Sequence, residues 1–134
     1  MHTTLWAVGL ALIGLAGLAH VGIFVLESVA WDRFGHRVFG VPADESAVVR
    51  PWAMNQGWYN LFLGLGALGG AIASLIAWYE VLAVAGSVAA FSALCMVGAA
   101  VVLVATNRRM LRGALIQGLL PLLGLTAIGI AALG

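Results

Sequence analysis

The chain is 134 residues long, 63% of them hydrophobic and only 8% charged, and its formal net charge is +1. Ordinary soluble domains carry roughly 25% charged residues, and a body this small cannot enclose so much apolar side chain, so the composition excludes a soluble domain. The near-neutral charge also excludes the basic surface of a nucleic-acid-binding protein, and we expect no nucleic-acid partner.

Four apolar stretches follow one another along the chain. Each is near or above the ~20 residues that a helix needs to cross ~30 Å of hydrocarbon. A membrane-spanning sheet would instead show alternating segments of ~10 residues. The sequence therefore predicts an all-α polytopic membrane protein, a four-helix bundle in one domain over residues 1–134. The expected spans are approximately 4–30, 52–78, 82–106 and 110–133.

The first stretch carries two ionisable residues, His20 and Glu27. It extends through Val29, which is too long for the core of a cleavable signal peptide, so we expect a retained span. His20, Phe24 and Glu27 follow i, i+4, i+7, and Trp31 continues the series at i+11. This spacing is typical of one helix face.

The first connection, about 32–51, is the only long one. Pro42 is followed closely by Asp44 and Glu45, and this order is typical of the start of a helix. We expect a short interfacial helix that ends before Pro51, and we expect Pro51 to begin the second span.

Amide and hydroxyl side chains mark the second and fourth spans. Asn55, Gln56, Tyr59 and Asn60 lie near the start of the second span, and Gln117 lies about two turns into the fourth. Polar groups in hydrocarbon are costly unless they meet partners or water. We therefore expect these side chains to face the interior of the bundle.

The glycine pair Gly66-x-x-x-Gly70 in the second span predicts close approach of another helix. That helix can belong to the same chain or to a second copy, so a homo-oligomer stays open. The single cysteine, Cys95, allows no intrachain disulfide and no CxxC pair. With no His/Cys spacing of the kind that binds metals, we expect no metal and no cofactor.

All six arginines fall in the first and third connections. The positive-inside rule then places these connections in the cytoplasm and both termini outside, in a cell membrane. Aromatic residues near the span ends favour the headgroup boundary, so membrane lipids are expected partners. The cluster at the third connection is interpreted as a topology signal, with binding of lipid phosphate as the alternative. The arginines are Arg33, Arg37, Arg50, Arg108, Arg109 and Arg112, and the aromatic residues are Trp31, Trp52, Trp58, Trp78 and Tyr79.

The polar membrane residues are expected to lie together in the half of the bilayer next to the arginines. Glu27 and His20 are then a candidate acid/base pair for proton transfer. The candidate binding residues for a ligand's polar end are Asn55, Gln56, Tyr59, Asn60, Gln117 and Trp31. Each of these residues also has a purely structural interpretation as an alternative to a catalytic or binding role. Glu27 can pair with Arg33 or Arg50, His20 can bond a neighbouring helix, and the amides can hold helices together.

Several of these residues resemble a known family. The similar segments are the run from Ala19-His20 through Glu27 to Trp31, the segment Val38-Phe39-Gly40, the block from Asn55 to Leu63 that contains N-Q-G-W-Y-N, and Gln117-Gly118 with Pro121. Together they resemble the small membrane proteins of domain-of-unknown-function family 1304. The resemblance covers essentially the whole chain and implies the four-helix fold and the polar site. Some members carry the label "epimerase", but the resemblance implies no particular activity. Ala19 stands where an acidic residue is expected, which argues against a second carboxylate beside His20.

Three functions compete at this stage. The first is a membrane-embedded protein whose polar pocket binds a lipophilic or small polar ligand, with isomerase-like proton transfer by Glu27 or His20. The second is a small oligomeric carrier or channel. The third is an accessory subunit whose polar network is purely structural. Clustered amides beside an ionisable pair exceed what helix packing needs, and this favours the first.

Overall fold

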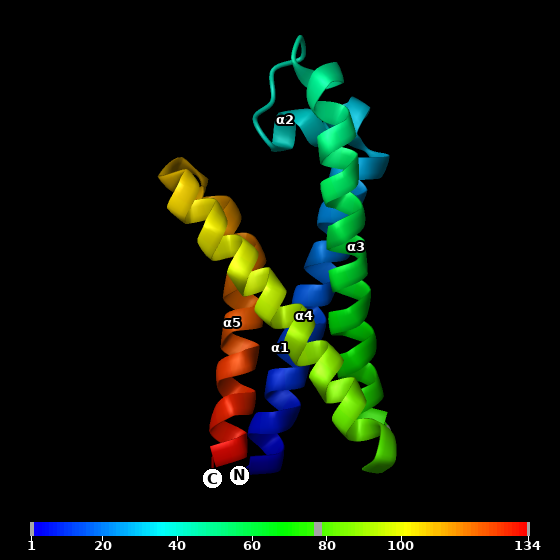
Figure 1. Ribbon diagram of the computed structural model, residues 1–134, viewed down its shortest axis with the longest axis vertical. Helices are drawn as coiled ribbons and strands as arrows, with labels where there is room; N and C mark the ends of the chain where they lie inside the picture. The colour runs from blue at the N-terminus through cyan, green and yellow to red at the C-terminus, as the bar shows by residue number, and fades with distance from the viewer. Residues whose placement is uncertain (1, 77–78, 134) are drawn as a thin grey trace.

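The computed structural model describes residues 2–76 and 79–133 (Figure 1). Four long helices dominate: α1 (His2–Phe24), α3 (Ser46–Ile76), α4 (Tyr79–Thr106) and α5 (Leu111–Leu133). In the described part, four helices are long and apolar enough to cross a membrane. The prediction of an all-α polytopic membrane protein is confirmed. The predicted end of the second span, at Trp78, lies outside the described residues.

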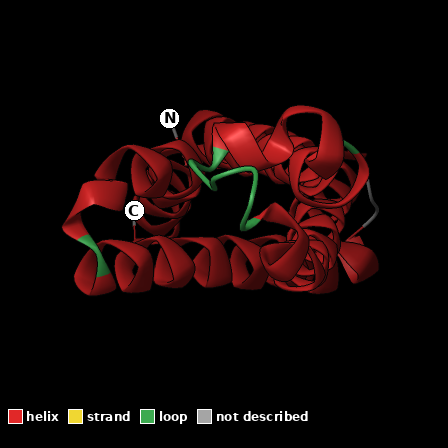
Figure 2. Cartoon of the chain, turned by 90° about the horizontal axis from the view of Figure 1, so that it is seen from above, coloured by secondary structure: helices red, strands yellow, loops and turns green. Residues whose placement is uncertain are grey.

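Shorter helical turns join the long helices. Two π-helical turns, η1 (Val25–Val29) and η2 (Trp31–Gly35), extend α1, and α2 (His36–Val38) follows them. A 3-10 turn, η3 (Arg108–Met110), links α4 to α5. Seen from above, the described chain is helical apart from short loops, and no strand is drawn in it (Figure 2).

The long helices form a ring in the order α1, α3, α4, α5, in which each helix contacts the next and α5 contacts α1. Both termini lie together at one end of the molecule (Figure 1). We call this the terminal end. The opposite end, which carries the first and third connections, is called the arginine end because every arginine lies there.

Glycines bring the helix backbones into direct contact. A Cβ atom added at Gly17 would lie 2.7 Å from the carbonyl oxygen of Gly64, between α1 and α3. A Cβ added at Gly124 would lie 2.9 Å from the carbonyl oxygen of Gly9, between α5 and α1. Such contacts are how membrane helices pack when burial from water supplies no driving force.

The Gly66-x-x-x-Gly70 motif of α3 packs against α4 of the same chain. A Cβ at Gly70 would lie 2.7 Å from the carbonyl oxygen of Ala85, and one at Gly66 would lie 2.5 Å from the Oγ of Ser92. The partner helix that the sequence left open is therefore intramolecular. Toward the arginine end α4 leans away from α3 (Figure 1).

The apolar core lies beneath the polar residues. Leu10, Ile13 and Met96 are fully buried, and alanines of α1, α3 and α4 fill the space around them. Small side chains keep the helices close, so the core is narrow. Its members are Leu10, Ile13, Ala16, Ala67, Ala71, Ala89, Ala93 and Met96.

The first connection differs from the prediction. The expected interfacial helix between Pro42 and Pro51 is not a separate element, because its residues from Ser46 onward form the first turn of α3, and the short helix of this connection is α2, at His36–Val38. The expected start of the second span was also wrong, because α3 begins at Ser46 and runs through Pro51.

Contacts with the first connection explain the early start of α3. The indole Nε1 of Trp31 donates to the carbonyl oxygen of Ser46 at 3.3 Å. The Nε of Arg50 lies 3.1 Å from the carboxylate of Asp32. Pro51 is the sixth residue of α3 and has no N–H to donate to the Ala47 carbonyl, and these contacts offset that loss and hold the added turn in helical form.

Candidate functional site

The candidate site is built on the π-helical end of α1. The amide of Ala30 donates to the carbonyl of Val25 at 2.7 Å, five residues back instead of four. The chain then folds so tightly that a Cβ at Gly35 would overlap the carbonyl oxygen of Leu26. Single π-helical turns are rare and recur at functional sites, because they widen the helix and redirect its side chains. Glu27 lies in the first of these turns.

Gly57 lets this turn press against α3. A Cβ at Gly57 would overlap the Oγ of Ser28 and lie 3.1 Å from the Cβ of Glu27. The Oγ of Ser28 donates to the carbonyl of Met54 at 3.2 Å. The missing side chain at Gly57 and the Ser28 hydrogen bond together seat Glu27 against α3.

The Glu27 carboxylate meets the amide of Asn60. The Nδ2 of Asn60 donates to Oε2 of Glu27 at 2.8 Å and to the carbonyl of Gln56 at 3.1 Å. Asn60 is only 7% exposed, whereas Glu27 is half-buried. This pair lies in helices that are apolar enough to span the membrane. Across residues 2–76 and 79–133, Oε1 of Glu27 has no hydrogen-bond partner.

Glu27 is not paired with an arginine. The structural interpretation of its role named Arg33 and Arg50 as partners, but Arg50 binds Asp32. Among the described residues, no basic side chain forms a salt bridge with Glu27. The carboxylate is therefore balanced inside the chain by one neutral amide only.

Aromatic rings lie beside this pair. Phe24 is the last residue of α1, three residues before Glu27. It packs edge-on against Trp58 of α3, with ring centroids 5.2 Å apart. Trp58 also contacts Phe62, at 5.9 Å. The polar pair is thus flanked by an apolar surface on the same two helices, a combination that suits a molecule with one polar and one apolar part.

His20 is deeper and separate from Glu27. It is 1% exposed, and its Nδ1–H donates to the carbonyl of Ala16 at 3.0 Å, on its own helix. Seven residues of helix separate it from Glu27, a rise of ~10 Å. No hydrogen bond joins the two side chains, so the structure does not assemble them into a directly coupled pair.

Gln117 is half-buried on α5, outside the α1–α3 pair. Pro121 is buried four residues later and has no N–H to donate to the Gln117 carbonyl. The side chain of Gln117 makes no hydrogen bond to Glu27 or Asn60. The expected convergence of Gln117 with these two residues is therefore absent at hydrogen-bond distance.

Three of the predicted inward side chains point outward. Asn55 and Gln56 are exposed, and Tyr59 is 59% exposed. The prediction that they face the interior was wrong. Successive helix positions differ by about 100°, so Asn55 and Tyr59 cannot share the face of Asn60. The buried face of α3 is the series Ala53, Gly57, Asn60, Gly64, Ala67 and Ala71.

Trp31 acts as an anchor for the first connection. It is 2% exposed, and its Nε1 is occupied by the Ser46 carbonyl. Its ring stacks on Phe39 at 6.3 Å and lies edge-on to His36 at 6.4 Å. Because its indole N–H already donates to Ser46, Trp31 has no free donor for a ligand.

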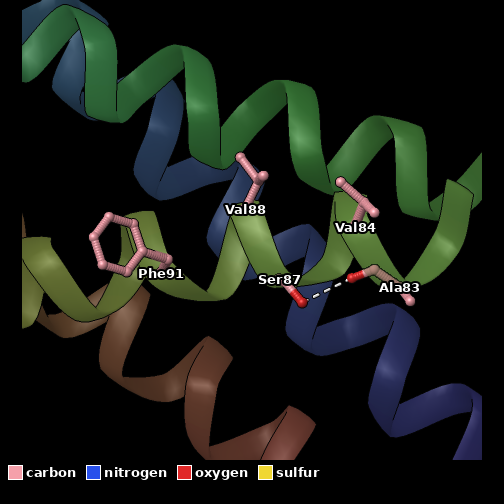
Figure 3. A pocket seen from close by; sticks show the side chains of 5 residues that line it. All are labelled: Ala83, Val84, Ser87, Val88 and Phe91. Carbon is pink, nitrogen blue, oxygen red and sulfur yellow. Dashed lines mark hydrogen bonds between the residues drawn. The ribbon is translucent and has the colours of Figure 1, made fainter.

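Two apolar hollows lie elsewhere on the molecule. One, of about 500 Å³, is a shallow depression on α4 near the terminal end, lined by Ala83, Val84, Ser87, Val88 and Phe91 (Figure 3). Its one side-chain hydroxyl, on Ser87, donates to the Ala83 carbonyl at 2.8 Å. A second hollow of about 480 Å³ shares part of this lining. Neither includes a predicted site residue.

Sequence reasoning missed two residues that shape the site, Ser28 and Gly57. Gly57 lies within the quoted N-Q-G-W-Y-N block, and its position three residues before Asn60 is a usable signal, since glycine on a buried helix face permits close approach. Ser28 carries no comparable signal, because a serine next to a span end is ordinary.

Comparison with known proteins identifies a family. A family model described as "Protein of unknown function (DUF1304)" matches residues 14–129. The matched region includes every residue from His20 to Gln117 discussed above. No curated protein and no solved structure matches the chain.

Proposed function

The chain belongs to the DUF1304 family of proteins of unknown function, and we propose that it binds the polar end of an amphiphilic molecule at the Glu27–Asn60 pair, within the membrane. One observation carries this proposal. A half-buried carboxylate in a membrane-spanning segment accepts a 2.8 Å hydrogen bond from a buried amide, and its other oxygen has no partner among the described residues.

Energetics favour a ligand over a purely structural role. A charged side chain within a membrane-spanning segment is costly, and a hydrogen bond to a charged group returns roughly 1.5–3 kcal/mol at most. Helix contact at this level is already supplied by Gly57 and Ser28. A carboxylate is thus more than the packing of α1 against α3 requires.

The ligand's chemistry follows from the groups that face it. Oε1 of Glu27 accepts hydrogen bonds, so the polar end carries a donor, either a hydroxyl or an ammonium group. Phe24 and Trp58 offer apolar surface to the remainder of the molecule. An amphiphile with a hydroxyl or ammonium head, reached from the surrounding leaflet, meets both requirements.

Native mass spectrometry of the protein extracted in mild detergent tests the proposal. Glu27→Gln keeps the shape of the side chain and an acceptor for Asn60 but removes the charge. We expect the wild type to carry an amphiphilic adduct and Glu27→Gln to lose most of it. Glu45→Gln, at an exposed loop position, is the matched control and keeps the adduct. Equal adduct on all three proteins contradicts the proposal.

Proton transfer by Glu27 is a second candidate function. It is favoured by the open Oε1, which can take a proton from a bound donor. His20 makes no hydrogen bond to Glu27 among the described residues, and a helix rise of ~10 Å separates the two, so it does not exchange a proton with Glu27 directly. Solvent deuterium that enters the bound molecule on the wild type but not on Glu27→Gln would support catalysis. If the wild type binds the molecule but incorporates no deuterium, the protein is a binding protein. If the wild type neither binds a molecule nor incorporates deuterium, the carrier and accessory functions are left.

We also propose that the arginine end faces the cytoplasm, because all six arginines lie there. In a Cys95→Ser background, Ala43→Cys reports on the arginine end and Leu133→Cys on the terminal end. A membrane-impermeant thiol reagent added to intact cells should label Leu133→Cys only. Labelling of Ala43→Cys alone would reverse the orientation.

A further inference from the structure

The two connections at the arginine end differ in charge balance. The first connection contains Arg33, Arg37 and Arg50 together with Asp32, Asp44 and Glu45, so its three positive and three negative charges are equal in number. The third connection contains three arginines, and no acidic residue follows Glu80 anywhere in the chain. The counter-charge for the third connection must therefore come from outside this end of the α4–α5 hairpin.

From this imbalance and the geometry of the turn, we propose that Arg108, Arg109 and Arg112 bind the phosphate of an anionic phospholipid in the leaflet at the arginine end. All three side chains are exposed, and none of them makes a salt bridge in the described part of the chain. Guanidinium groups bind phosphate oxygens through paired hydrogen bonds. This site lies on a different helix pair from Glu27 and does not rest on the function proposed above.

The turn holds the three arginines in a defined arrangement. The Oδ1 of Asn107 accepts from the amide of Arg109 at 3.1 Å, and the amide of Met110 donates to the Asn107 carbonyl at 2.9 Å. Met110 is half-buried, which anchors the turn. Arg108 and Arg112 are four residues apart, and helical side chains lean toward the helix N-terminus, so Arg112 projects back toward the turn.

The surface below the arginines distinguishes a lipid from free phosphate. Leu115 and Leu119 follow Arg112 at i+3 and i+7 on α5, and they are 51% and 47% exposed. They form an apolar track that continues from the phosphate position into the membrane. An acyl chain fits this track, whereas inorganic phosphate would use none of it.

The test compares two double variants that remove the same charge. The purified full chain is reconstituted in nanodiscs of equimolar phosphatidylglycerol and phosphatidylcholine, and the retained lipids are measured by native mass spectrometry. Each arginine near a membrane surface contributes ~1 kcal/mol, or about fivefold in affinity, so Arg108→Gln/Arg109→Gln should lower the phosphatidylglycerol preference roughly thirtyfold. Arg33→Gln/Arg37→Gln should leave it nearly unchanged.

Two further arms make the result decisive. Arg108→Lys/Arg109→Lys keeps the charge but not the paired hydrogen bonds, so its preference should fall between those of the wild type and the glutamine double, which separates lipid binding from a folding defect. Inorganic phosphate at millimolar concentration should not displace the lipid. The proposal is overturned if the wild type shows no preference, if both glutamine doubles lose it equally, or if free phosphate competes fully.

Discussion

The terminal and arginine halves of the bundle are held together by different means. Near the terminal end, backbones touch through glycines such as Gly9, Gly70 and Gly124, and the space between them is apolar. Toward the arginine end, α4 leans away from α3 (Figure 1). There the side chains of Glu27 and Asn60 make a polar contact between α1 and α3.

This difference separates stability from chemistry within one small protein. Close backbone contact leaves no room for a ligand, so the terminal half serves the fold. Where α4 leans away, the polar side chains of α1 and α3 must satisfy one another or an outside molecule. Variants in the two halves should therefore have different effects, strong on stability in one and strong on binding in the other.

The largest expected effect comes from filling a helix contact in the terminal half. A Cβ at Gly70 would lie within 3.0 Å of backbone atoms of Ala85 and Ala89, which cannot move independently. Gly70→Val should lower the free energy of unfolding by about 3 kcal/mol, the upper range for overpacking. Gly69→Val is the control, since nothing lies within 4 Å of a Cβ there. Thermal unfolding in detergent measures both, and equal shifts would contradict glycine-mediated packing.

Part of this difference between the terminal half and the arginine half can be predicted from the sequence. Hydropathy predicts four spans, and the spacing of His20, Phe24, Glu27 and Trp31 predicts their common inward side. Glu27 lies near the end of the first span and Asn60 near the start of the second, so the sequence predicts that they lie at a similar depth in the membrane. These predictions depend on helix periodicity and length, and the α-helical period holds in α1 up to Phe24 and through α3.

Other features were missed in the sequence or depend on tertiary contacts. Asn55 and Tyr59 have residue types that suit a buried site, but their helical phase relative to Asn60 turns them outward. The π-helical turns around Ala30 follow from the approach of Gly35 to Leu26, and no residue pattern announces that approach. A sequence shows which groups are polar, but it does not show where the α-helical period is interrupted.

The next effect concerns the hydrogen bond between Glu27 and Asn60. Hydrogen bonds to charged groups contribute about 2 kcal/mol, so the interaction energy from a double-mutant cycle of Glu27→Leu and Asn60→Leu, each of which removes the bond, should approach that value. Unfolding of the wild type, both single variants and the double variant supplies the cycle. Asn55→Leu makes the same replacement at an exposed position of α3, and as the matched control it should show no coupling to Glu27. An additive cycle for Glu27 and Asn60 would mean that the pair is not formed.

A smaller effect on stability, with a clear effect on binding, is expected at Gly57. Gly57→Ala places a methyl group against the Oγ of Ser28 and should cost about 1 kcal/mol while moving Glu27 away from Asn60. The amphiphilic adduct should decrease accordingly. Adding Ser28→Ala removes the obstructing hydroxyl and should restore part of it. Gly22→Ala, where a Cβ meets nothing within 4 Å, is the control, and an effect equal to that of Gly57→Ala would contradict this explanation.

The smallest effect is expected at the one salt bridge among the described residues, between Arg50 and Asp32. Its two side chains are 45% and 68% exposed, and exposed ion pairs contribute less than about 1 kcal/mol because water and salt screen them. Arg50→Gln should therefore shift unfolding by a few tenths of a kcal/mol, and the shift should vanish at ~1 M salt. The Trp31 hydrogen bond to Ser46 still holds the start of α3 in this variant. A large, salt-independent loss of unfolding free energy would instead place Arg50 among the residues that hold the arginine end together. The first connection would then contribute to stability, and the arginine half could not be described as the half that serves binding alone.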